Sequence, residues 1–169
     1  MMKSIFVSVI AVGMMGSAAQ AAEVVAEVTG ADGQSHGTVT VTDTESGMAH
    51  AVLELTGLPE GTVAVHLHET GDCSSDDFSS AGGHIASDAD HGIDSAAGPH
   101  PGDLPNLHVS ADGSGMVEHF LPEFDVETYL LDDDGSAFVI HAGTDDYTSQ
   151  PSGDAGDRIA CGVFEHRGE

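Results

Sequence analysis

Positively charged side chains are almost missing from this sequence. Its 169 residues include 3 Lys plus Arg against 29 Asp plus Glu, which gives a formal net charge of -26. Such a polyanion repels phosphate backbones and anionic lipids, so we expect no nucleic-acid partner and no membrane-surface partner. Because 40% of the residues are hydrophobic and only 19% are charged, the composition also differs from that of a disordered acidic tail. We therefore expect a folded body with an acidic surface.

Long apolar runs are also missing, and the one candidate lies at the N-terminus. Lys3 precedes the apolar run Ile5–Met15, and the small-residue sequence Ala19-Gln20-Ala21 follows it. The run is too short to span a bilayer, and the pattern is typical of a cleaved signal peptide. We interpret 1–21 as a signal peptide and 22–169 as one periplasmic or secreted domain, with no membrane attachment after cleavage. The mature chain then has two positive side chains and a formal charge of 2 minus 29, or -27.

Cysteine is scarce, and both residues, Cys73 and Cys161, lie in the mature chain. In an oxidising compartment, an even pair within one small domain indicates a disulfide, and two buried free thiols are the alternative. A bridge closing 161 minus 73, or 88, residues stabilises a fold by about 4 to 5 kcal/mol on the chain-entropy model.

Alternating apolar and polar residues dominate the mature chain, whereas helical periodicity is scarce. Stretches such as EVVAEVT and GTVTVTD alternate with period two and are separated by Gly, Asp or Pro. The pattern predicts eight strands, at Glu23–Thr29, His36–Asp43, Ala49–Thr56, Thr62–Glu69, Leu107–Ala111, Gly115–Leu121, Ser136–Ala142 and Arg158–Glu165. Many short strands of this kind are typical of an all-β sandwich or barrel.

Two stretches interrupt this rhythm. Residues 71–106 are rich in Gly, Ser, Asp and His, and residues 143–157 form a second, shorter irregular segment. Loops of this length in a compact domain are usually functional or disordered.

The histidines favour a metal site. In VAVHLH, the period-two rule places His66 and His68 on the same face of a strand, where they could meet one metal ion or simply form polar surface. His141 ends another apolar run, and an imidazole-only set of His66, His68, His141 and one shared histidine suits copper, although zinc could also occupy it.

The first long loop contributes further candidate ligands. Three imidazoles and one carboxylate, from His84, His91, His100 and Asp103, make a set that suits tetrahedral zinc. The alternative is a solvated loop that binds nothing.

These segments together resemble the copper/zinc superoxide dismutases, particularly their bacterial periplasmic branch. The matching segments, in family order, are VAVHLHETGDC, SSAGGH, HPGDLPNLHVSADG, FVIHAGTDDY and GDAGDRIACGVF. The resemblance implies an eight-stranded Greek-key β-barrel or flattened sandwich with two long functional loops. It also implies dismutation of superoxide to dioxygen and hydrogen peroxide, with one copper and one zinc per subunit, in a monomer or a homodimer.

The resemblance also implies a role for each matching residue. The implied copper ligands are His66, His68, His84 and His141. The implied zinc ligands are His84, His91, His100 and Asp103, so that the deprotonated ring of His84 bridges the two metals and later carries a proton. The other implied roles are Arg158 as guide for superoxide, Asp145 as hydrogen-bond partner of His66 and His91, and Cys73 with Cys161 as the family disulfide.

One departure from the family pattern concerns charge. Family members often carry lysines in the second loop, but 143–157 has none and contains four aspartates. Arg158 is then the only positive side chain expected to guide an anionic substrate. The competing interpretations are a copper/zinc-binding or copper-delivery module without turnover and a purely structural acidic domain.

Overall fold

Antiparallel β-strands are the main regular secondary structure of the chain. The computed structural model describes residues 22–167, so the expected signal peptide lies outside the described residues. The strands are β1 (Glu23–Gly30), β2 (Ser35–Asp43), β3 (Met48–Leu55), β4 (Gly61–Val63), β5 (Val65–His68), β6 (Leu107–Val109), β7 (Gly115–Pro122), β8 (Ala137–His141) and β9 (Arg158–His166). The all-β prediction is confirmed, whereas the Greek-key connection stays a prediction.

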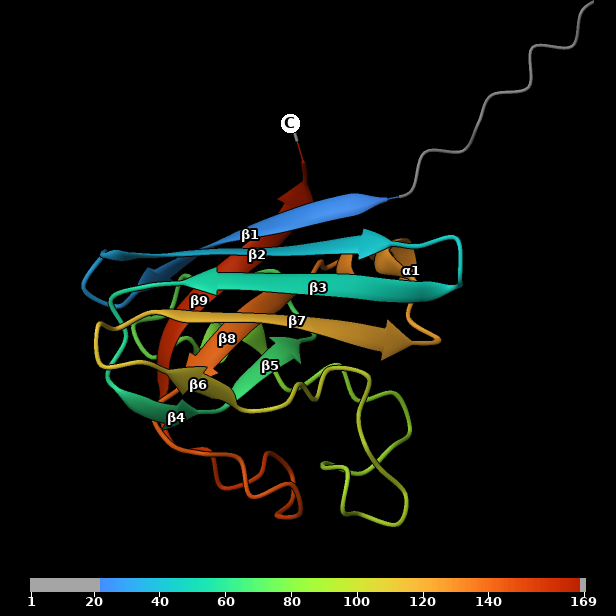
Figure 1. Cartoon of the computed structure of the whole chain (residues 1–169). Coiled ribbons are helices and arrows are strands. Elements are labelled where there is room, and N and C mark those ends of the chain that lie inside the picture. Colours follow the sequence, from blue (N-terminus) through green and yellow to red (C-terminus); the bar gives the residue numbers. More distant parts are fainter. Residues whose placement is uncertain (1–21, 168–169) are drawn as a thin grey trace, which may run out of the picture.

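Seven strands form one curled sheet in the order β5-β8-β9-β1-β2-β3-β7, and β4 pairs with β6. Figure 1 shows β1, β2, β3 and β7 as one layer, with β9, β8 and β5 crossing behind it. Both long loops extend from the same side of these layers (Figure 1). No helix in the part of the chain that the structure describes is long and apolar enough to cross a bilayer.

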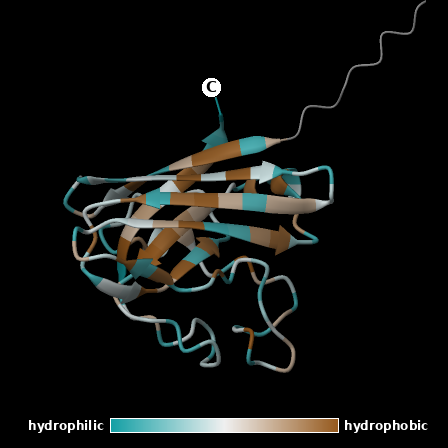
Figure 2. Cartoon of the chain, viewed as in Figure 1, coloured by the Kyte–Doolittle hydropathy of each residue, from teal (hydrophilic) through white to brown (hydrophobic). Residues whose placement is uncertain are grey.

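The core lies between the two layers because side chains alternate across each strand. On β3, every second residue is fully or almost fully buried, and Figure 2 shows hydrophobic and hydrophilic bands alternating along the strands. Residues from both layers, including Val39, Leu53, Leu67, Phe138 and Ile140, join in one apolar cluster. Full burial of each such side chain contributes about 1.5–3 kcal/mol, so this cluster is the main source of stability.

The strands β5 and β8 differ from the others because all their residues are buried. Leu67 and Ile140 face the main core, while the opposite face of these strands carries Val139 and lies beneath loop residues. The expectation that His66 and His68 share a face therefore holds, but that face is not polar surface. Their exposed fractions are 0% and 1%.

The fourth expected strand, Thr62–Glu69, is two strands in the structure. At Ala64 the chain leaves β6 and joins β8: the Ala64 N–H donates to the Gly143 carbonyl at 2.7 Å, and the Ala64 carbonyl accepts from the His141 N–H at 2.9 Å. Alternation in the sequence reports which face a side chain occupies but not which strand lies alongside, so this change of partner could not be predicted.

A short helix, α1 (Val126–Leu130), was also missed. The Asp125 carboxylate caps it by accepting from the Thr128 N–H at 2.8 Å, and Val126 and Leu130, four residues apart, are buried. Five residues are too few to display a helical period, although Asp125 was a usable capping signal.

The predicted disulfide between Cys73 and Cys161 is confirmed, with Cα atoms 5.8 Å apart. Cys161 lies in β9, and Cys73 lies in the loop that follows β5. Both pack in a small second apolar cluster with Phe78, Ala81 and Val139. The bridge therefore fastens the first long loop onto the outer face of β8 and β9.

Candidate metal centre

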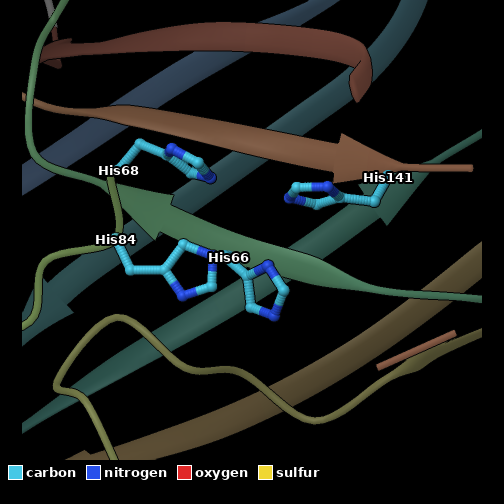
Figure 3. Close-up of side chains that lie close together, drawn as sticks. All are labelled: His66, His68, His84 and His141. Carbon is cyan, nitrogen blue, oxygen red and sulfur yellow. The ribbon is translucent and has the colours of Figure 1, made fainter. Parts of the chain in front are cut away.

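Four histidines from three parts of the chain converge on one buried space. His66 and His68 come from β5, His141 ends β8, and His84 follows the short 3-10 turn Ser79–Ala81. One ligand atom from each ring lies within 4.8 Å of the others, and Figure 3 shows the rings turned toward one another. We call these four residues the four-histidine cluster.

In three of these four rings, a hydrogen bond occupies one nitrogen and leaves the other nitrogen without a partner. His68 donates from Nδ1 to the Gly82 carbonyl at 3.0 Å, and His141 donates from Nδ1 to the Gly156 carbonyl at 3.2 Å. His66 donates from Nε2 to the Asp145 carboxylate at 2.8 Å. Each ring therefore has one protonated and one unprotonated nitrogen, because a neutral imidazole has a single N–H.

The free nitrogens are buried and have no hydrogen-bond partner. They are His66 Nδ1, His68 Nε2, His84 Nε2 and His141 Nε2. A buried polar atom without a partner costs about 1–3 kcal/mol, so four of them in one place call for an additional ligand. Four imidazole nitrogens fit a copper ion, which favours such ligands.

Burial also keeps three of these rings, those of His68, His84 and His141, neutral. It lowers the pKa of His68 to about 2 and the pKa values of His84 and His141 to about 4, because a charged imidazolium loses its hydration there. At neutral pH the ring lone pairs are therefore available to a metal ion.

We expect the metal-free protein to lose stability as the pH falls from 7 to 5. The unfolded rings take up protons near pH 6.5, whereas the folded rings resist them down to about pH 4, so protons favour the unfolded state in this window. The combined loss is on the order of a few kcal/mol. Urea unfolding of the metal-free chain at both pH values measures it. The His141→Gln variant should show a shallower dependence, and a flat wild-type profile would contradict the expectation.

A second group, the Asp103 cluster, contains His84, His91, His100 and Asp103. The Nδ1 atoms of the three histidines lie 2.9, 2.9 and 3.1 Å from Asp103 Oδ1. Neighbouring ligands of a tetrahedral zinc with bonds of ~2.0 Å are roughly 3.3 Å apart, so the spacing fits a zinc ion among these atoms. His84 belongs to both groups, with Nδ1 on one side and Nε2 on the other.

One detail distinguishes the geometry from the sequence expectation. The set of possible ligand atoms around Asp103 that all lie within 4.8 Å of one another comes from His66, His84, His91 and Asp103, without His100. We nevertheless place His66 in the four-histidine cluster, because its Nε2 is occupied by Asp145 and its free Nδ1 is the partnerless atom. His100 remains in the Asp103 cluster because its Nδ1 approaches the same carboxylate oxygen as the other two rings.

The Asp103 carboxylate is held in place as an anion. Its Oδ2 accepts from the backbone N–H groups of Gly92 and His100 at 2.8 and 3.0 Å. Burial alone raises the pKa of Asp103, but the hydrogen bonds from His84, Gly92 and His100 outweigh it and hold that pKa well below its usual range. The second oxygen is thus anchored while Oδ1 faces the three rings.

Asp145 links the two groups. Its fully buried carboxylate accepts from His66 Nε2 at 2.8 Å and from His91 Nε2 at 3.0 Å. Burial alone raises the pKa of Asp145, but these two hydrogen bonds and a third from the Tyr147 N–H outweigh it and lower that pKa to about 2. The aspartate therefore stays ionised at neutral pH and orients one ring in each group.

Arg158 lies beside the four-histidine cluster, opposite His141 in the register of β8 and β9. Its guanidinium donates from Nη1 to the Phe78 carbonyl and from Nη2 to the Gly82 carbonyl, both at 2.6 Å. The Gly82 carbonyl also accepts from His68. The half-buried arginine is therefore fastened to the loop that the disulfide holds, next to a proposed ligand.

Three supporting residues were not anticipated from the sequence. The Asn106 side chain pairs with both backbone polar groups of Asp145, each at 2.9 Å, and the Gln150 side chain pairs in the same way with His91. Gly153, with φ of 68°, leaves no room for a side chain, because a Cβ would lie 1.9 Å from Asp145 Oδ1. Only the glycine, in its S-G-D context, offered a signal in the sequence.

Taken together, the curled antiparallel sheet, the shared histidine and the two ligand groups define a β-sheet protein with two adjoining candidate metal sites. A family model described as copper/zinc superoxide dismutase (SODC) matches residues 35–164. The Cu-Zn superoxide dismutase of Caulobacter vibrioides is 43% identical over 147 residues, covering 83% of this chain and 84% of that protein. The chain belongs to the copper/zinc superoxide dismutase family.

Solved structures agree with this assignment. A SOD-like protein from Bacillus subtilis matches with a TM-score of 0.78 and 34% identity, over 82% of this chain and 96% of that one. The Cu/Zn superoxide dismutase from Brucella abortus matches with a TM-score of 0.70 and 26% identity, over 85% of this chain and 99% of that one. The family resemblance stated from the sequence is confirmed.

Proposed function

We propose that this protein is a copper/zinc superoxide dismutase that binds copper in the four-histidine cluster and zinc in the Asp103 cluster. The observation that carries the proposal is the set of four buried, partnerless nitrogens, one of which belongs to the ring shared with the Asp103 cluster. The reaction converts two superoxide anions and two protons into dioxygen and hydrogen peroxide. A bound copper ion supplies the one-electron exchange in both halves of the reaction, and zinc contributes geometry and charge without changing oxidation state.

Hydrogen-bonding groups of the protein orient the proposed ligands for this reaction. Asp145, the Gly82 carbonyl and the Gly156 carbonyl hold His66, His68 and His141 with the correct nitrogen facing inward. His84 can hold a proton at Nε2 when that atom is not a ligand, which makes it the proposed proton carrier. The Asp103 carboxylate keeps the His84 ring in place through its contact with Nδ1.

Arg158 is the proposed guide for the anionic substrate. Arg167, the other positive side chain among the described residues, lies on the surface and pairs with Glu23 at 2.7 Å. Distant acidic groups are screened beyond about 8 Å at physiological ionic strength, so the local charge of Arg158 can act despite the acidic surface.

We expect Arg158→Ala to keep both metals and to lower the rate of superoxide consumption severalfold or more. The matched control is Arg167→Ala, which removes the same charge from a place away from the cluster and should leave the rate nearly unchanged. Rates are measured with metal contents determined on the same samples. Equal rates for wild type and Arg158→Ala would remove Arg158 from the mechanism.

Localisation and assembly complete the proposal. The disulfide is compatible with an oxidising compartment, so we propose cleavage of residues 1–21, export to the periplasm and a single domain over 22–169. The acidic surface repels nucleic acids and anionic membrane surfaces, so we propose that neither is a partner. We propose a monomer or a homodimer, which sedimentation of the mature protein distinguishes.

One experiment tests the function. The full chain is expressed with export to a bacterial periplasm, copper and zinc are quantified per mature chain, and superoxide consumption is assayed. Near-stoichiometric metals with turnover support the proposal. Metals without turnover would indicate a copper/zinc-binding or copper-delivery module instead, and the absence of both metals would exclude both interpretations.

A further inference from the structure

The side chain of Gln150 forms a closed hydrogen-bonded pair with the backbone of His91. Gln150 Oε1 accepts from the His91 N–H at 2.8 Å, and Gln150 Nε2 donates to the His91 carbonyl at 2.9 Å. The amide of Gln150 thus satisfies both backbone polar groups of one residue, as a neighbouring strand would. The two residues are 59 positions apart and belong to different long loops.

Further contacts hold both sides of this pair. Gln150 Nε2 also lies 3.0 Å from the Thr148 carbonyl and 3.2 Å from Ser95 Oγ. The Ser95 hydroxyl in turn donates to the His91 carbonyl. The amide is therefore oriented by its own loop and by the first long loop together.

His91 has no freedom left once these contacts form. Its ring is fully buried, with Nδ1 2.9 Å from Asp103 and Nε2 3.0 Å from Asp145. A histidine side chain has two rotatable bonds, so the position of its ring depends directly on the position of its backbone. Gln150 controls that backbone.

We propose that Gln150 is a positioning residue for the zinc ligand His91. It holds the His91 backbone so that Nδ1 of the ring faces Asp103 while Nε2 faces Asp145. This inference rests on the proposed zinc site. It is distinct from a general packing role, because Gln150 is exposed and takes no part in either apolar cluster. Loss of its side chain therefore affects the ligand more than the fold.

The pairing also couples the two long loops to the metal. Zinc binding favours the conformation in which His91 is in place, and Gln150 ties that conformation to an ordered second loop. Because binding equilibria are reciprocal, an interaction that strengthens zinc binding is itself strengthened by zinc. The second loop, which ends next to Arg158, should therefore gain more order from zinc when Gln150 is present than when its side chain is removed.

The test compares the full mature protein with Gln150→Ala. We expect the zinc dissociation constant to rise about tenfold or more, as is usual when outer hydrogen-bond partners of metal ligands are removed. Copper affinity in the zinc-free protein and the urea midpoint of the metal-free protein should be nearly unchanged. Cobalt(II) bound in place of zinc should show an altered visible spectrum, which reports the ligand geometry directly.

The matched control is Gln34→Ala. Gln34 is the other glutamine among the described residues, and its side chain donates to Asp32 on the surface. It should leave zinc affinity and the cobalt spectrum unchanged. Hydrogen exchange of residues 143–157, with and without zinc, gives a second readout: zinc should protect this loop in the wild type and in Gln34→Ala but much less in Gln150→Ala.

The outcomes separate this inference from the proposed function. If the wild type binds zinc and Gln150→Ala binds it equally well with the same cobalt spectrum, the positioning role is wrong and the function stands. An equal fall of copper affinity, zinc affinity and metal-free stability in Gln150→Ala would indicate a merely structural role and also overturn the inference. If the wild type itself binds no zinc, the proposed zinc site fails.

Discussion

The Asp145→Ala variant should lose about 10- to 100-fold in affinity for each metal and most of its dismutase activity under limiting metal. In the wild type, the His66 and His91 Nε2–H groups donate to this carboxylate at 2.8 and 3.0 Å. Its removal leaves both groups buried without an acceptor. Each unsatisfied group costs about 1–3 kcal/mol, and both rings become free to rotate. Because one ring belongs to each group, copper and zinc binding should both fall.

Two further variants make this prediction specific. Asp145→Asn keeps one acceptor oxygen and should give an intermediate loss, since an amide can serve one ring but not both. Asp146→Ala removes a neighbouring carboxylate whose hydrogen bonds go to Thr148 and Ser149 in its own loop, so metal affinity should stay near the wild-type value. Competition titrations against chelators measure the affinities. If Asp145→Ala bound both metals like the wild type, the linking role of Asp145 would be wrong.

The paired substitution Cys73→Ser and Cys161→Ser should lower the free energy of unfolding of the metal-free protein by about 2–5 kcal/mol. The disulfide closes 88 residues, so its loss enlarges the unfolded ensemble. The effect should also reach the site. The first long loop supplies the Phe78 and Gly82 carbonyls that hold Arg158, and a loosened loop should lower the rate even at full metal occupancy.

Urea unfolding of the metal-free proteins measures the stability change. The wild type treated with a thiol reductant serves as the control, because it should match the paired variant, whereas the variant itself should not respond to reductant. Equal urea midpoints for oxidised wild type and the variant would show that the bridge does not stabilise this fold.

Predictions from the sequence succeeded where local chemistry decides structure. The strand positions followed from period-two alternation, and the shared face of His66 and His68 followed from the same rule. The change of strand partner at Ala64 was missed because the neighbouring strand, not the local sequence, decides it. The helix α1 was missed because five residues are too few to show a helical period. The disulfide could be predicted because only one pairing of two cysteines exists.

The site divides in the same way. Residue types and spacing in the sequence, with the family resemblance, determined the candidate ligands, the metals they suit and the single guiding arginine. Only the tertiary structure decided which nitrogen of each ring is free, because the acceptors at Gly82, Gly156 and Asp145 lie 14, 15 and 79 residues away from the rings that they orient. The roles of Gln150 and Asn106 likewise arise from contacts with residues 59 and 39 positions away, and the role of Gly153 arises from its close approach to Asp145. Ligand chemistry is a property of single side chains, whereas orientation and protonation depend on the neighbours that folding brings to them.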